Sequence, residues 1–382
     1  MGEKKVKRRS PLWARVCVGL GAGVLVVSGG SLVAGQQLVS SYTEKLTDNS
    51  LLDSVEDKPA EAGQVKADIN GPVNILLTGI DPRDDKTAPL SDSILIAHIP
   101  RDRHSAYVFS IPRDLRADIP AFAKSGTGGG RSKINAAMAW GSSLGDGKYS
   151  EAQGFQLLAK TVGDVTGIKK FDAGAIVNFG GFQKIVEAMG GVEMVIDMDV
   201  QSEHRQPNGK IRERKPGCPV TSDCDHPYTG PAKFYKKSDK PVKLKAWEAL
   251  DYVRQRYPNV KGVAMSDYDR QRHQQQFIKA IAKQAMSRDV VTDPAKLAAV
   301  MDAAGGSLTF AGGDHTILEW AVEMKDLNVD DMVTVKLPGE GIYEPNYKGE
   351  RFLDGVDDFF KAVTEDRVAA FLLDNPTYVN MS

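Results

Sequence analysis

Charged side chains gather where three short apolar runs of the sequence begin or end. Asp81 follows the run 73–80, Asp92 precedes the run 93–99, and Arg113 follows the run 106–111. In open α/β sheets, ligands bind outside the carboxyl ends of the strands, where Asp81 and Arg113 are expected to lie. Arginine suits an anionic ligand there, because its planar guanidinium group binds phosphate through two parallel hydrogen bonds.

A second group of arginines follows later in the chain. Arg254 and Arg256 lie where a helical pattern ends before Pro258, and Arg270 and Gln274 lie four residues apart on the next helical pattern, hence on one face. Two cations about 6 Å apart repel each other by about 2–3 kcal/mol at an effective dielectric constant of about 20. Several arginines in one pocket are therefore expected to need an anion.

The elements that position these residues alternate between strand and helix. Strand-like apolar runs cover 73–80, 93–99, 106–111, 192–196 and 332–336, the last of these expected to be the terminal strand. Helical patterns cover 151–165, 182–189, 244–253, 267–286, 294–303 and 315–327. The first three runs are almost continuously hydrophobic, which indicates a sheet covered on both faces. The alternation predicts an α/β fold, specifically an α/β/α sandwich.

The N-terminal region predicts a membrane anchor. Residues 1–15 carry six cations and 16–36 form an uncharged apolar stretch, long enough at about 1.5 Å per residue to span a bilayer. A cleaved signal peptide is the alternative. The cations place the N-terminus in the cytoplasm, which makes the chain a single-pass membrane protein with an extracytoplasmic domain. Residues 37–70 read as a linker with a short helix around 51–55, and residues 71–382 as the catalytic domain.

The cysteines indicate the compartment of the protein, and the net charge argues against one class of function. Cys218 and Cys224 lie in a charged insertion, residues 201–242, and a disulfide between them is expected in an oxidising compartment. A zinc site that includes His226 is the weaker alternative. With 49 basic and 50 acidic residues, the net charge of −1 argues against a nucleic-acid-binding protein with a generally basic surface.

These motifs, in this order, resemble those of the LytR-CpsA-Psr cell-wall ligases. The motifs are GIDPRDD, SDS, SIPRDLR, SKINAA, the stretch from FGGF to AMGGV, VRQR and DYDRQRHQQ, between about Val73 and Leu337. The resemblance implies an α/β/α sandwich with a central mixed sheet that holds a polyprenyl (pyro)phosphate. It also implies Mg²⁺-dependent transfer of a phosphate-linked glycopolymer, such as teichoic acid, capsule or arabinogalactan, from that lipid carrier to a peptidoglycan hydroxyl group.

The resemblance assigns roles by position. The implied catalytic residues are Asp81, Asp92 and Arg113, and the two aspartates are also the implied ligands of Mg²⁺ or Mn²⁺. The implied pyrophosphate- and lipid-binding residues are Arg83, Arg113, Arg116, Lys133, Arg254, Arg256, Arg270 and Gln274. Two positions depart from the family pattern, since Leu90 and His273 stand near places where members often carry arginine. A peripheral phosphate contact is expected to be missing or replaced there.

Three other functions fit parts of the same pattern. A polyprenyl-pyrophosphate hydrolase would use the same arginines with water as the acceptor. A membrane-bound regulator fits less well, because only about fifteen residues precede the apolar stretch and no DNA-binding helix-turn-helix is visible. A lipid-binding protein without catalysis is the third. Ser110 lacks the G-x-S-x-G elbow of a serine hydrolase, and His98, His104, His226 and His315 show no nucleophile partner or metal spacing, so all four are expected to be structural.

Overall fold

The computed structural model describes residues 48–52, 71–81, 87–218, 224, 227–285, 287, 294–305, 308–313, 315, 320, 323–324 and 327–380. The predicted cytoplasmic tail, the membrane segment, most of the linker and Arg83 lie outside these residues. Within the part of the chain that is described, no helix is both long enough and apolar enough to cross a membrane.

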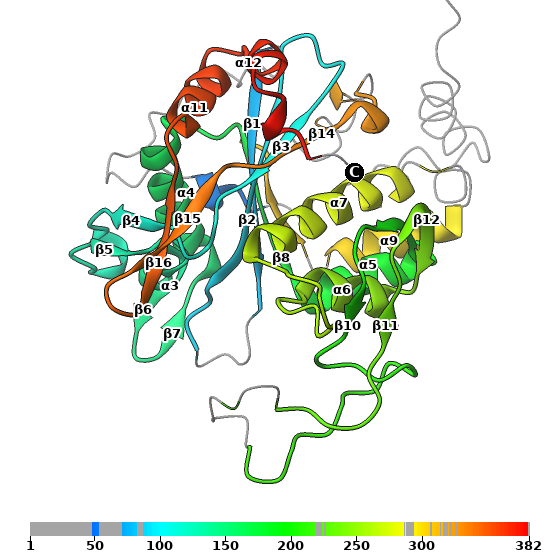
Figure 1. Ribbon diagram of the computed structural model, residues 1–382. Coiled ribbons are helices and arrows are strands. Elements are labelled where there is room, and N and C mark those ends of the chain that lie inside the picture. Colours follow the sequence, from blue (N-terminus) through cyan, green and yellow to red (C-terminus); the bar gives the residue numbers. More distant parts are fainter. Residues whose placement is uncertain are drawn as a thin grey trace, which may run out of the picture.

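A mixed six-stranded sheet forms the centre of the molecule (Figure 1). Its order is β13 (Leu308–Ala311), β8 (Ala173–Asn178), β1 (Val73–Ile80), β2 (Ser91–Ile99), β3 (Tyr107–Ser110) and β14 (Val333–Val335). Strand β2 is antiparallel to both β1 and β3, whereas β8 is parallel to β1 and β14 is parallel to β3. The C-terminal ends of β1 and β3 and the N-terminal end of β2 therefore lie at the same end of the sheet.

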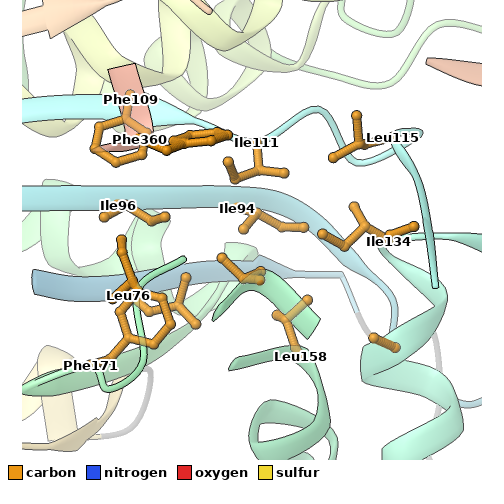
Figure 2. Close-up of a cluster of buried hydrophobic side chains, with 14 of the residues drawn as sticks. Leu76, Ile94, Ile96, Phe109, Ile111, Leu115, Ile134, Leu158, Phe171 and Phe360 are labelled. Atoms are coloured by element: carbon orange, nitrogen blue, oxygen red, sulfur yellow. The ribbon is translucent and has the colours of Figure 1, made fainter. Parts of the chain in front are cut away.

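Both faces of the sheet are covered, as the continuous apolar runs predicted. Leu76 and Ile80 of β1 belong to the largest hydrophobic cluster, and the alternate residues Ile75 and Leu77 pack against a different cluster. Figure 2 shows the first cluster, in which side chains of β1, β2 and β3 meet Leu158 and the aromatic rings of the C-terminal part. The predicted α/β fold with a central mixed sheet is confirmed.

Two groups of elements flank the sheet (Figure 1). The first group contains α3 (Ala136–Ser142), α4 (Glu151–Thr166), α11 (Val356–Thr364), α12 (Val368–Asp374) and the hairpins β4–β5 (Arg116–Ile119, Gly130–Lys133), β6–β7 (Ser143–Gly145, Lys148–Tyr149) and β15–β16 (Gly339–Tyr343, Tyr347–Phe352). The second group contains α5 (Phe179–Ala188), α6 (Ala246–Arg254), α7 (Asp267–Ala285), α9 (Pro294–Gly305) and the pairs β9–β12 (Val192–Ile196, Ser238–Leu244) and β10–β11 (Val200–Gln201, Phe234–Tyr235). Short 3₁₀ turns cover Asn49–Leu52 (η1), Ala123–Ser125 (η2), Val329–Asp331 (η4) and Pro376–Tyr378 (η5).

The structure corrects three features of the sequence-based scheme. The strand at 332–336 is not the terminal element, because β15, β16, α11 and α12 follow it and Phe359 and Phe360 of α11 are buried in the main core. Strands β8 and β13 were missed. Part of the predicted linker belongs to the folded domain, since Leu51 of η1 is fully buried. Of the predicted helix 315–327 only a few residues are described.

The insertion is held by a disulfide between Cys218 and Cys224, whose Cα atoms lie 5.9 Å apart. Disulfide-bonded sulfurs are not thiolates, so the zinc alternative at these two cysteines is wrong. His98 is fully buried, with Nδ1 2.9 Å from Asn74 Oδ1 and Nε2 3.2 Å from Asp366 Oδ1. Its place in the core agrees with the structural role expected of it.

Candidate functional site

A cavity of about 680 Å³ lies at the end of the sheet where β1 and β3 end and β2 begins. Seven of the predicted site residues line it: Asp81, Asp92, Arg113, Arg254, Arg256, Arg270 and Gln274. They come from segments that are far apart in the sequence, namely the three strand ends, the end of α6 and the start of α7. The fold therefore brings four of the predicted arginines and both predicted carboxylates to one cavity.

Arg113 reaches the cavity from the turn that follows β3. Its Nη1 donates to Asp92 Oδ1 at 2.5 Å, and its Nε lies 4.0 Å from Asp114 Oδ2. Burial by itself lowers the pKa of Arg113, but the carboxylates of Asp92 and Asp114 outweigh it and raise this pKa above its ordinary value. The buried Nε has no hydrogen-bond partner among the described residues.

Arg270 is the most deeply buried of the four arginines, with a side chain 6% exposed. Burial lowers its pKa; the nearby cations Arg113 and Arg256 act in the same direction, and Asp267 opposes them. Arg270 Nη2 lies 2.6 Å from Asp267 Oδ1, yet that oxygen and Arg270 Nε both lack a hydrogen-bond partner among the described residues. A buried cation with an unsatisfied donor is costly by itself and favours an anion in the cavity.

The end of α6 supplies the other two arginines. Arg254 is the last residue of the helix, and its Nη2 donates to Asp81 Oδ2 at 2.5 Å. The buried Gln255 has extended backbone angles and ends the helix, so Arg256 lies outside it. The side chain of Gln255 donates to Asp251 Oδ1 at 3.0 Å, which fixes the chain between the two arginines.

Buried glutamines hold α7 against the sheet. Ser93 of β2 donates to Gln274 Oε1 at 3.0 Å, and Gln275 Nε2 donates to Ser110 Oγ at 2.9 Å and to the carbonyl oxygen of Val335 at 3.2 Å. Phe277 on the same helix is also buried and contributes an apolar contact. The polar contacts add what an apolar face cannot: they fix the helix in register, so that Arg270 and Gln274 reach the cavity.

A polar network supports α7 on its other side. Asp197 accepts hydrogen bonds from Tyr252 at 2.9 Å and from Arg272 Nε at 2.6 Å, and its Oδ1 lies 2.8 Å from His273 Nε2. Burial acts to raise the pKa of Asp197, but the contacts with His273 and Arg272 outweigh it and hold this pKa well below its usual range. His273, which replaces an arginine common in the resembled family, therefore lies in a structural network.

The two candidate metal ligands are paired with arginines. Asp81 contacts Arg254 and Asp92 contacts Arg113. Among the described residues, no group of three or more His, Cys, Asp or Glu side chains could hold a metal ion. Two carboxylates on one cavity nevertheless suit Mg²⁺, which binds one or two carboxylates and takes its other ligands from phosphate oxygens and water. The donor set thus fits Mg²⁺ together with a phosphate ligand.

Arg116 and Lys133 do not line the cavity. They face each other across the β4–β5 hairpin, where Lys133 Nζ lies 3.0 Å from Asp114 Oδ1. The C-terminal hairpin completes this cluster, because Tyr347 donates to Glu350 at 2.8 Å and to Asp114 at 3.4 Å. Asp114 thereby links Arg113 to β16. Arg83 lies outside the described residues, and the phosphate-binding roles of Arg83, Arg116 and Lys133 stay predictions.

Several cavity residues were not foreseen. His204, Arg205, Ile211 and Tyr228 come from the insertion, and Trp247, Leu250 and Asp251 come from α6. A signal existed for the second set, since 247, 250, 251 and 254 share one face of a helix by their spacing. No local pattern marks the insertion residues, because their position depends on contacts that are distant in sequence.

Comparison with known proteins identifies relatives of the chain. The model of the LytR_cpsA_psr family matches residues 34–364. The probable cell wall biosynthesis protein LcpB of Corynebacterium glutamicum is 28% identical over 315 residues, which are 79% of this chain and 60% of that protein. The polyisoprenyl-teichoic acid–peptidoglycan teichoic acid transferase TagU of Bacillus cereus is 26% identical over 272 residues, with 71% of this chain and 70% of TagU covered.

Solved structures share the fold. A structure of TagT bound to LI-WTA superposes with a TM-score of 0.52 at 21% identity, and the match covers 82% of this chain and 96% of that one. At this identity the likeness concerns the fold alone. The chain spans about 60% of the length of LcpB.

Proposed function

The chain belongs to the LytR-CpsA-Psr family, and on that premise we propose that it transfers a glycopolymer phosphate from a polyprenyl-pyrophosphate carrier to a hydroxyl group of peptidoglycan. The observation that carries the proposal is the convergence of Arg113, Arg254, Arg256 and Arg270 on one cavity with Asp81 and Asp92. The relatives TagU, named as a teichoic acid transferase to peptidoglycan, and LcpB, named as a probable cell wall biosynthesis protein, support this class of reaction.

In the proposed mechanism, the four arginines bind the diphosphate of the donor. Guanidinium groups form paired hydrogen bonds to phosphate oxygens, and they oppose the negative charge that develops as the bond to the leaving lipid phosphate breaks. Burial, together with the cations Arg113 and Arg256, lowers the pKa of Arg270, and a bound diphosphate would favour its charged form. The hydroxyl group of the acceptor sugar attacks the phosphorus, and its proton passes to the carboxylate of Asp81 or Asp92.

Asp81 and Asp92 are the proposed ligands of Mg²⁺, or of Mn²⁺, which would neutralise phosphate charge. In the described structure each aspartate pairs with an arginine of the cavity. A diphosphate competes for the same arginines, so its binding releases both carboxylates. Without substrate, the two aspartates thus hold the arginines in place. With the diphosphate bound, they are available as ligands of the metal ion.

We also propose that residues 16–36 anchor the chain in the cell membrane, with the N-terminus in the cytoplasm and the domain outside. The supporting observations are the uncharged stretch with its flanking cations and the disulfide between Cys218 and Cys224, because disulfides persist mainly in oxidising compartments outside the cytosol.

The experiment is a reconstituted transfer assay. The purified full chain is mixed with Mg²⁺, a lipid-linked glycopolymer and peptidoglycan, and the polymer that becomes covalently attached to peptidoglycan is measured. The proposal expects attachment that depends on the chain. Release of the polymer with no attachment to peptidoglycan would instead identify a hydrolase, and binding of the lipid with neither product would identify a lipid carrier.

A further inference from the structure

The cavity of about 680 Å³ that Arg113, Arg254, Arg256 and Arg270 line is called the arginine cavity below. A second cavity, of about 550 Å³, lies beside it. We call it the Tyr257 groove, and its lining residues are Gln201, Glu203, Arg212, Tyr228, Tyr257, Pro258, Asn259 and Val260. Tyr228 lines both cavities and is the one residue that their linings share among the described residues. Tyr257 directly follows Arg256, an arginine of the first cavity. The two cavities are thus neighbours in sequence and in space.

The groove is built by the base of the insertion and the segment that follows α6. The amide of Gln201 donates to the carbonyl oxygen of Pro258 at 2.7 Å, and Asn259 Nδ2 donates to the carbonyl oxygen of Gln201 at 3.1 Å. The amide of Glu203 donates to Gln255 Oε1 at 2.9 Å. These bonds tie both walls together and connect them to the end of the helix that carries Arg254, so the groove is preformed.

Asn259 adds backbone evidence for a built site. Its φ is 51°, in the left-handed region, which costs energy for a residue other than glycine and is tolerated best by asparagine and aspartate. Such conformations persist where the surroundings hold them, often at ligand sites. Here the side-chain bonds of Asn259 to Gln201 and, at 3.3 Å, to Glu203 Oε2 provide that hold.

The lining has the chemistry of a sugar-binding surface. The Tyr257 side chain is 56% exposed and presents an aromatic face with a hydroxyl group at its tip. The C–H face of a pyranose ring packs on such a face, while its hydroxyl and amide groups bond to polar side chains. Glu203, Asn259 and Gln201 line the same groove and carry one carboxylate and two side-chain amides.

We propose that the Tyr257 groove binds the glycan strand of the acceptor, a chain of N-acetylated hexosamines, next to the reacting phosphate. The proposal rests on the proposed function of the arginine cavity. The donor's own sugars are covalently joined to the diphosphate and need space continuous with it, which the first cavity of about 680 Å³ provides. Apart from Tyr228 the groove has its own lining residues, and it therefore suits the substrate that is not attached to that diphosphate.

The test distinguishes a groove that binds the acceptor from a groove that binds the donor. Tyr257→Ala and Tyr257→Phe are prepared in the full chain, with Tyr343→Ala as a matched control because Tyr343 is another exposed tyrosine, 70% exposed on the C-terminal hairpin. Steady-state transfer is measured against soluble peptidoglycan fragments and against the lipid-linked donor. Binding of β-1,4-linked N-acetylglucosamine tetramer is measured by calorimetry, which needs no activity.

The proposal expects Tyr257→Ala to raise KM for peptidoglycan fragments at least tenfold and to weaken tetramer binding to a similar degree. KM for the donor stays within twofold, Tyr257→Phe behaves like the unchanged chain, and Tyr343→Ala has no effect. A rise in KM for the donor instead would assign the groove to the donor polymer and overturn the proposal. Unchanged acceptor kinetics and tetramer binding in Tyr257→Ala would also overturn it.

A third result concerns the proposed function alone. If the unchanged chain binds the tetramer through Tyr257 but attaches no polymer to peptidoglycan, the groove is supported and the transfer reaction is contradicted. If the chain transfers polymer and no variant alters acceptor kinetics or binding, the transfer reaction is supported and the groove is contradicted.

Discussion

At the scale of single residues, Arg270 is the side chain on which the site depends most. It is buried beside Arg113 and Arg256, and burial together with these cations lowers its pKa. We expect Arg270→Gln to reduce transfer by about 100-fold or more, the usual loss when one charge-stabilising donor is removed. Its thermal unfolding midpoint should change little, because the substitution removes the repulsion from Arg113 and Arg256 together with the ion pair to Asp267, and these two effects oppose each other.

Arg272 on the same helix is the matched control. It contacts Asp197 and Asp269, each at 2.6 Å, and does not line the arginine cavity. Arg272→Gln should lower the free energy of unfolding by about 1–3 kcal/mol, because it removes the ion pairs to the partly buried carboxylates of Asp197 and Asp269, and it should keep most of the transfer activity per folded molecule. If both variants lost activity equally, or neither did, the distinction between a ligand-binding and a structural arginine would be wrong.

Asp197 gives the fold a predicted pH dependence. Its pKa is depressed in the folded protein, so its contribution to stability is complete above the unfolded value near 3.8 and is lost as the pH falls below that value. Urea unfolding between pH 5 and 3 should therefore show a steeper loss of stability for the unchanged chain than for Asp197→Asn. Equal slopes would contradict this assignment.

The sequence predicted candidate site residues that lie at the ends of strands and helices or in the first turn of a helix. Arg113, Arg254 and Arg270 were predicted from motif order, and all three line one cavity. Arg116 and Lys133 pair across the β4–β5 hairpin and do not line this cavity, and Lys133 forms an ion pair with Asp114. A motif places a residue along the chain, but the side of a strand to which it points depends on pairing partners that the motif does not contain.

At the scale of elements, the C-terminal hairpin supports the arginine cavity from behind. Tyr347 of β16 donates to Asp114, the carboxylate next to Arg113, and to Glu350. Glu350 also accepts a hydrogen bond from Tyr268 of α7 at 3.3 Å. The hairpin therefore connects the turn after β3, which carries Arg113, with the start of α7, which carries Arg270.

We expect Tyr347→Phe to reduce kcat for transfer by about fivefold, equivalent to about 1 kcal/mol for one hydrogen bond. KM for the acceptor should not change, because Tyr347 lines neither cavity. Tyr343→Phe on the neighbouring strand is the control and should have no effect. A Tyr347→Phe variant with full kcat would show that the hairpin does not position Arg113.

Helices α4, α6 and α7 were predicted nearly to their ends, but α11, α12 and several strands were missed. Strand β8 reads AGAIVN, and alanine and glycine are depleted in strands. The structure explains the composition, since a Cβ atom at Gly174 would lie 2.7 Å from the ring of Phe155. Close packing of α4 on the sheet requires glycine there, and this requirement is invisible until the two elements are in contact.

At the scale of the whole molecule, the folded domain begins before its first strand. Leu51 of η1 is fully buried in the main core, and the amide of Asp48 donates to the carbonyl oxygen of Phe310 at 2.9 Å. Gln156 of α4 also donates to the carbonyl oxygen of Ser50. The segment that follows the predicted membrane anchor is therefore attached to the sheet and to α4.

Leu51→Ala should lower the free energy of unfolding by about 2–4 kcal/mol, the usual cost of a cavity left by a buried leucine. Leu373→Ala is the control, because this leucine is 83% exposed, and it should change stability by less than about 0.5 kcal/mol. Urea unfolding measures both. A Leu51→Ala variant as stable as the control would show that the segment does not contribute to the core.

The most direct measurement is a crystal structure of the chain with a short-chain prenyl diphosphate and Mg²⁺. The diphosphate is expected in the arginine cavity, with oxygens about 2.7–2.9 Å from the guanidinium groups of Arg113, Arg254 and Arg270 and with Asp81 and Asp92 released from their arginines. A diphosphate bound elsewhere, or a cavity in which Arg113 and Arg254 keep their aspartates and contact no phosphate, would contradict the proposed site.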